Sequence, residues 1–168
     1  MRSKRNRQYL GIITAVIAYY IIHEGAHLMV ALCLGVFKTI NFMGMGVQID
    51  VHHTLMTDTQ MGFFCLAGPM ASLVFAYVLV ALTDVICQNK NILFRALFYY
   101  VTITMLMLDP LYLSFIYKFV GGGDMNGISL LIPETMVQCI FGTLLIINFF
   151  VFWKIVLPKY IKAQECYC

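Results

Sequence analysis

Four long apolar stretches divide the chain. They cover residues about 9–36, 61–83, 92–117 and 135–153, and only a few ionisable residues interrupt them. A bilayer core of roughly 30 Å requires about 20 consecutive, mostly apolar helical residues. Each stretch is long enough to meet that requirement, so the pattern predicts four transmembrane helices.

The segment between the first two apolar stretches has a different pattern of residues. Residues 39–51 contain Gly44 and Gly46. Apolar and polar residues partly alternate along this segment, which ends in β-branched residues. That pattern favours short extended strands over a helix. We therefore expect an all-α membrane protein with about four transmembrane helices and a short membrane-associated β segment between helices 1 and 2.

Composition supports a membrane environment. The 168 residues are 61% hydrophobic and 11% charged, whereas an average soluble domain is about 25% charged. A soluble core of this size cannot hide so much apolar surface. No repeat, low-complexity tract or appended soluble domain is visible, so residues 1–168 are expected to form one integral-membrane domain. The net charge of +3 gives no indication of a nucleic-acid partner.

The basic residues are distributed unevenly. Four spans place both termini on one side of the membrane, and nine of the eleven lysines and arginines fall in the segments on that side. The loops on the other side carry only Lys38 and Lys118. Because cytoplasmic segments are enriched in basic residues, we expect a multi-pass protein with cytoplasmic N- and C-termini.

One motif carries candidate chemistry. His23-Glu24-Gly25-Ala26-His27 lies within the first apolar stretch. Helical positions i and i+4 share a face, so both imidazoles can reach one metal ion. A glutamate between them can accept a proton from the attacking water, as in the H-E-x-x-H pattern of zinc metalloproteases. The structural alternative is a polar cluster that holds helices together. Ionisable residues within a transmembrane span cost free energy, however, and their presence there usually indicates a functional site.

A catalytic zinc site needs a third protein ligand. The chain contains no C-x-x-C pair, which argues against a cysteine site. Asp109 lies beside Pro110 in the third stretch, and Asp124 follows three glycines. Asp124 has the alternative role of a helix N-cap. His52 and His53 are further candidates, although solvation at the membrane interface explains them more simply, and the residues alone leave the choice open.

Three blocks of sequence resemble the site-2 protease family of intramembrane metalloproteases. They are the histidine motif in a first span, residues 66–69 (Leu-Ala-Gly-Pro) opening a second, and a later aspartate motif. The resemblance covers residues 9 to about 132. Ser72 stands where the family often has asparagine, and no glycine directly follows Asp124.

The resemblance implies a three-helix catalytic core with one zinc ion per chain. Its ligands would be His23, His27 and Asp124, and Glu24 would be the general base. Asp109-Pro110 is similar to an element in which the family places a polar residue before the metal aspartate.

The family also has a membrane-embedded edge strand that binds unwound substrate, and residues 43–49 resemble it. Four residues are accordingly candidates for substrate binding: Gly44, Gly46, Asp109 and Asn126. The expected activity is hydrolysis of peptide bonds in or near transmembrane segments of membrane-protein substrates.

A non-catalytic membrane protein, either a zinc-binding scaffold or a metal carrier, is the alternative function. A carrier would need several alternating sets of ligands along a path, and the sequence shows one cluster. A degenerate protease is expected to lose Glu24, which this chain retains.

Overall fold

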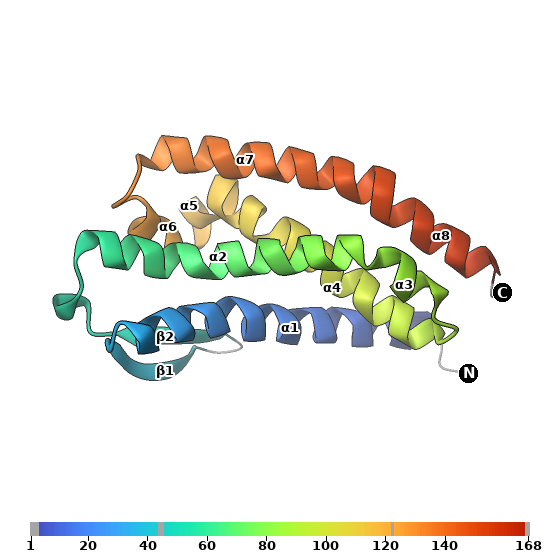
Figure 1. The fold of residues 1–168 in the computed structure, drawn as a ribbon, viewed down its shortest axis with the longest axis horizontal. Helices are drawn as coiled ribbons and strands as arrows, with labels where there is room; N and C mark the ends of the chain where they lie inside the picture. Colours follow the sequence, from blue (N-terminus) through green and yellow to red (C-terminus); the bar gives the residue numbers. More distant parts are fainter. Residues whose placement is uncertain (1–3, 44–45, 122, 167–168) are drawn as a thin grey trace.

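A computed structural model describes residues 4–43, 46–121 and 123–166 of the chain. It contains four helices that are long and apolar enough to cross a membrane, which confirms the expected fold class (Figure 1). These four spans are α1 (Lys4–Cys33), α2 (Asp58–Ala81), α4 (Ile92–Leu111) with its continuation to Val120, and α7 (Glu134–Val151) with its continuation to Glu165.

Shorter elements connect and extend the spans. A two-stranded antiparallel sheet follows α1, as the sequence predicts. The remaining elements are β1 (Phe37–Met43), β2 (Gly46–Val51), the 3₁₀ turn η1 (His53–Leu55), α3 (Thr83–Gln88), the π-helical turn η2 (Tyr112–Ile116), α5 (Tyr117–Val120), α6 (Gly123–Ile128), the π-helical turn η3 (Phe152–Val156) and α8 (Leu157–Cys166).

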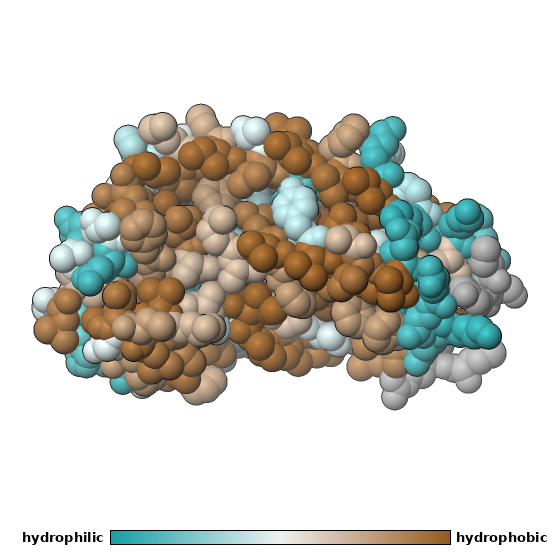
Figure 2. Space-filling view, in the orientation of Figure 1, coloured by the Kyte–Doolittle hydropathy of each residue, from teal (hydrophilic) through white to brown (hydrophobic). Residues whose placement is uncertain are grey.

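Helices α1, α2 and α4 pack against one another and form the core of the bundle, while α7 packs against α4 and η2. Both termini lie at one end of the bundle, and the hairpin and α6 lie towards the other end (Figure 1). Hydrophobic side chains cover most of the visible surface, and hydrophilic ones gather most densely at the end with the termini (Figure 2). This distribution suits a molecule surrounded by lipid.

Helix ends are set by local capping. At the start of α2, the Thr57 side chain accepts a hydrogen bond from the Gln60 amide, and the Gln60 side chain accepts one from the Thr57 amide. This capping box starts the helix at Asp58, three residues before the predicted span. At the end of α1, Gly35 has a φ of 68°, a conformation in which glycine avoids the steric cost of a side chain.

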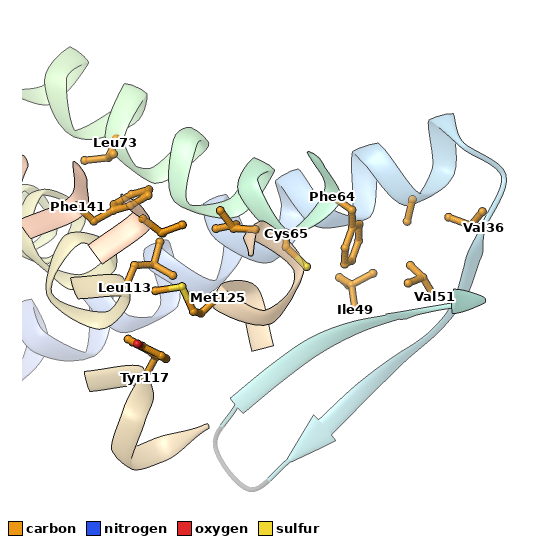
Figure 3. Packing of buried hydrophobic residues seen from close by; sticks show 13 residues of the cluster. Val36, Ile49, Val51, Phe64, Cys65, Leu73, Leu113, Tyr117, Met125 and Phe141 are labelled. Atoms are coloured by element: carbon orange, nitrogen blue, oxygen red, sulfur yellow. The ribbon is translucent and has the colours of Figure 1, made fainter. Parts of the chain in front are cut away.

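The hairpin packs its apolar face on the helices. Ile49 and Val51 of β2 are buried, whereas Gln48 is exposed and Asp50 is half-buried. Ile49 and Val51 point towards Phe64 of α2 and Val36 (Figure 3). Because side chains alternate between the two faces of a strand, this packing fixes which face of the hairpin looks inwards.

Pro110 interrupts the hydrogen bonding of α4 without ending the helix. Proline has no amide N–H, so the carbonyl of Leu106, four residues earlier, loses its helical donor. Asn148 of α7 replaces it, because its Nδ2 donates to the Leu106 oxygen at 2.6 Å. The Asn148 Oδ1 in turn accepts from the Tyr77 hydroxyl at 2.6 Å. One buried amide thus joins α2, α4 and α7.

Candidate metal centre

Three potential ligands meet between α1 and α6. His23 and His27 lie one turn apart on α1, and Asp124 approaches them from α6. The two Nε2 atoms are 3.2 Å apart. Asp124 Oδ2 lies 3.1 Å from His23 Nε2, and its Oδ1 lies 3.4 Å from His27 Nε2. Both histidines are almost fully buried, at 5% and 3% exposed, so the group can hold a metal ion.

These separations fit tetrahedral coordination. Two ligands that each lie about 2.0–2.1 Å from a zinc ion are about 3.3 Å apart at a tetrahedral angle. The three measured separations, 3.1–3.4 Å, are close to this value. Two imidazoles and one carboxylate also form a donor set typical of catalytic zinc, which leaves the fourth position for water or substrate.

A backbone carbonyl orients the His27 ring. His27 Nδ1 lies 2.7 Å from the carbonyl oxygen of Phe64 in α2. A carbonyl can only accept, so Nδ1 carries the proton and Nε2 presents its lone pair to the other ligands. Outer partners of this kind set the tautomer and orientation of histidine ligands.

A carboxylate orients the His23 ring. Asp109 Oδ1 lies 3.3 Å from His23 Nδ1 and accepts a hydrogen bond from the Tyr19 hydroxyl at 2.5 Å. The Asp109 side chain is 0% exposed, and its Oδ2 has no hydrogen-bond partner in the described part of the chain. Ser72 Oγ lies 3.5 Å from the same ring nitrogen. The His23 Nε2 is therefore also directed towards Asp124.

Gly68 of α2 provides the space for both imidazoles. A Cβ atom at this position would lie 2.4 Å from His27 Nε2 and 2.7 Å from His23 Nε2. No real Cβ makes contacts this short, and the obstructed atoms are the two ring nitrogens that face Asp124. The glycine of the Gly68-Pro69 block thus gives both imidazoles the room to lie beside Asp124.

A cavity of about 710 Å³ opens beside the three ligands. Its wall includes His23, Glu24 and His27 of α1, the inner side of β2, and parts of α2, η2 and α6. Most of this wall is apolar. Its polar groups include the histidine motif and Asp124, and also Asp50, His53 and Asn126.

The edge of β2 faces this cavity. Strand β2 pairs with β1 on one side only, and the Ile49 amide donates away from β1 to Glu24 Oε2 at 3.1 Å. Backbone groups two residues apart in a strand point the same way. The N–H and C=O of Val47 are therefore directed to the same side, and in the described part of the chain no second strand pairs with this edge of β2 beside the cavity.

The structure brings together most of the sequence-predicted site residues. Gly46 and Asn126 line the cavity with Glu24. Asp109 does not line it, because it lies behind the His23 ring with no exposed surface. Gly44 lies outside the described residues.

His52 and His53 are not part of the group of three ligands. His53 lies at the cavity wall, where its Nε2 is 3.8 Å from Asp50 Oδ1. Asp50 also accepts a hydrogen bond from Lys38 Nζ at 2.8 Å. This bond to the ammonium group of Lys38 is the main reason that the pKa of the Asp50 carboxyl lies below its ordinary value.

Sequence reasoning did not find Tyr19 or the Phe64 carbonyl. Tyr19 precedes His23 by four residues, so helical periodicity places it on the same face, and this spacing was a usable signal. The Phe64 carbonyl carries no side-chain signature at all. Its role depends on how α2 docks against α1.

Comparisons with protein-family models, characterised proteins and solved structures found no match to this chain.

Proposed function

We propose that the protein is an intramembrane zinc metalloprotease that hydrolyses peptide bonds in or near transmembrane segments of other membrane proteins. The observation that carries the proposal is the shared cavity. His23, His27 and Asp124 present ligand atoms at tetrahedral separations, and Glu24 lies on the same wall. A scaffold that only binds metal has no need of the glutamate or of the adjoining strand edge.

Zinc held by these ligands would polarise the scissile carbonyl and lower the pKa of water. Glu24 then acts as the general base, accepting a proton from the attacking water and passing it to the departing amine. Its Oε2 is already held by the Ile49 amide. Asp109 and Phe64 act through the histidines, because they hold the rings with Nε2 directed inwards.

The strand edge supports a peptide as the substrate. A transmembrane helix satisfies its own backbone hydrogen bonds, so cleavage requires local unwinding and new partners for the freed groups. The unpaired edge of β2 offers such partners through strand addition. Gly46 and Asn126, which line the same cavity, are the proposed substrate contacts.

Glu24→Gln provides the first test. The amide can still accept the Ile49 hydrogen bond but cannot take a proton from water, so cleavage should fall about 10²–10⁴-fold while the metal stays bound. The assay is cleavage of a transmembrane peptide library by purified protein, with metal content measured by elemental analysis. Wild-type protein should contain one zinc per chain.

Glu165→Gln is the matched control, because Glu165 is an exposed carboxylate on α8 outside the cavity. It should cleave at the wild-type rate. A Glu24→Gln variant that cleaves normally would exclude Glu24 as the base. Wild-type protein that holds zinc but cleaves no member of the library would favour the scaffold function.

A further inference from the structure

Strand β2 directs the amides of alternate residues away from β1. Backbone groups two residues apart in a strand point to the same side, and the residues concerned are Val47, Ile49 and Val51. The Ile49 amide donates to Glu24 Oε2 at 3.1 Å, and the Val51 amide donates to Asp50 Oδ1 at 3.0 Å. Carboxylates therefore occupy two of the three amides on this edge of the strand.

The position of Ile49 explains why its amide needs a partner. Ile49 is 6% exposed and lines the mainly apolar cavity beside the metal centre. A backbone amide without a hydrogen-bond partner at such a place costs free energy. Glu24 supplies the partner in the empty site. A peptide strand added to this edge can supply it equally well, through one of its carbonyl groups.

The two partners compete for one proton. Each backbone amide has a single N–H to donate, and Glu24 Oε2 already receives the N–H of Ile49. A peptide carbonyl that pairs with Ile49 must therefore displace the Glu24 side chain. The displaced carboxylate remains on the cavity wall with His23 and His27, because all three residues belong to the same turn of α1.

The carboxylate on Val51 is held more firmly than the one on Ile49. Asp50 Oδ2 accepts a hydrogen bond from Lys38 Nζ at 2.8 Å, which ties its side chain to β1. Among the described residues, no lysine or arginine pairs with Glu24. Glu24 can therefore leave its amide more easily than Asp50 can, so an added strand should pair as far as Ile49 and stop before Val51.

We propose that the Ile49 amide is a shared group, which holds Glu24 in the empty site and passes to a carbonyl of the bound peptide. Pairing of the peptide with β2 then frees the proposed base when the substrate is in place. Ile49 is in this sense a positioning residue that acts through its main chain. The inference rests on the proposed protease function, because the peptide is the substrate of that reaction.

Binding of an uncleaved peptide to two Glu24 variants tests the exchange. Glu24→Gln and Glu24→Ala both remove the charge and the base, but only glutamine can still accept from the Ile49 amide. The probe is a fluorescent leucine–alanine peptide of about 20 residues with two central glycines, and its Kd is measured by anisotropy in detergent with zinc-loaded protein. Glu24→Ala should bind it about three- to tenfold more tightly, the factor expected for one hydrogen bond. Equal Kd values would overturn the proposal.

Asp50→Asn and Asp50→Ala form the matched control pair at the neighbouring amide. They should bind the peptide equally, because the added strand stops before Val51. A difference as large as that between the Glu24 variants would mean that removing any nearby side chain improves binding, and would overturn the shared role of Ile49.

Ile49→Pro removes the shared amide itself. Proline is tolerated in an edge strand where the lost N–H points away from the sheet, and zinc content reports whether the metal centre still folds. In this background Glu24→Gln and Glu24→Ala should bind the peptide equally. A difference that persisted would exclude the Ile49 amide as its cause. If the proline variant fails to fold, the Glu24 and Asp50 pairs still decide.

Cleavage by the wild-type protein separates this inference from the proposed function. Normal cleavage with equal binding by the two Glu24 variants would keep the protease and reject the shared amide. Tighter binding by Glu24→Ala without cleavage by the wild type would keep the shared amide and reject the protease. A peptide that bound to none of the variants would reject the shared amide as well.

Discussion

Asp109 and Asp124 lie on opposite sides of the His23 ring. Asp124 is 3.1 Å from Nε2, and Asp109 is 3.3 Å from Nδ1. Both separations are short enough for direct interaction, yet only the Nε2 side also faces His27. The two carboxylates therefore have different expected roles, ligand for Asp124 and orientation of the ring for Asp109.

Asp124→Ala should lose zinc, whereas Asp109→Ala should retain zinc and cleave more slowly. Loss of an outer partner of a histidine ligand typically costs about 10–100-fold in activity or affinity. Elemental analysis after dialysis measures the first effect and a cleavage assay the second. Asp109→Asn, which keeps an oxygen that can accept from Nδ1, should recover part of the rate. If Asp109→Ala lost zinc and Asp124→Ala kept it, the two roles would be reversed.

Gly68→Ala should abolish metal binding even though it adds a single methyl group. The new Cβ would lie 2.4 Å from His27 Nε2, so a ring must leave its position. Gly25→Ala is the matched control, since a Cβ there meets nothing within 4 Å and alanine favours a helix. Zinc content measured on both variants decides the point. Normal zinc content in Gly68→Ala would show that the rings have room to move.

The hydrogen bond between Asn148 and Leu106 depends on Pro110. Asn148→Leu should destabilise the protein by about 0.5–2 kcal/mol, the range for polar contacts between membrane helices. In a Pro110→Ala background the new amide can donate to the Leu106 carbonyl, so the same substitution should cost less. Unfolding in mixed micelles measures the four corners of this double-mutant cycle.

Thr143→Val serves as the control for the cycle, because the exposed Thr143 hydroxyl bonds within its own helix to the Cys139 carbonyl at 2.8 Å. It should have the same small effect in both backgrounds. Strict additivity of Asn148→Leu and Pro110→Ala would mean that the asparagine does not replace the missing helical donor.

Much of this architecture follows from sequence pattern. Apolar length predicts the four spans, and the glycines with alternating residues at 39–51 predict the hairpin. Helix α2 begins three residues before its apolar stretch because the capping residue Thr57, rather than hydropathy, determines its start. Helix α4, capped by Asn91, begins at Ile92, where its apolar stretch begins.

The site was less predictable than the fold. The i, i+4 spacing of His23 and His27 is a local property of one helix and can be read directly. The position of Asp124 depends on how α6 docks against α1, and the contact between Asn148 and Leu106 joins residues 42 positions apart. No local pattern encodes such docking, which is why the choice between Asp109 and Asp124 required a structure or a family resemblance.

Both termini lie at the same end of the bundle (Figure 1). The basic residues of the chain concentrate in segments of that end, so we expect it to face the cytoplasm. Reporter fusions at either terminus should be active only on the cytoplasmic side. A fusion after Cys168 that is active only outside would invert the orientation and place the metal centre nearer the cytoplasmic face.

The contact between Gly68 and the two imidazoles has a genetic consequence. Glycine is the only genetically encoded amino acid without a Cβ, so every missense change at this codon introduces the atom that would lie 2.4 Å from His27 Nε2. Chemical similarity offers no protection, because alanine and serine share the obstruction with tryptophan. In a population of this gene, codon 68 should therefore carry silent changes alone, whereas the codon for Gly25 in α1, where a Cβ meets nothing within 4 Å, is free of that constraint.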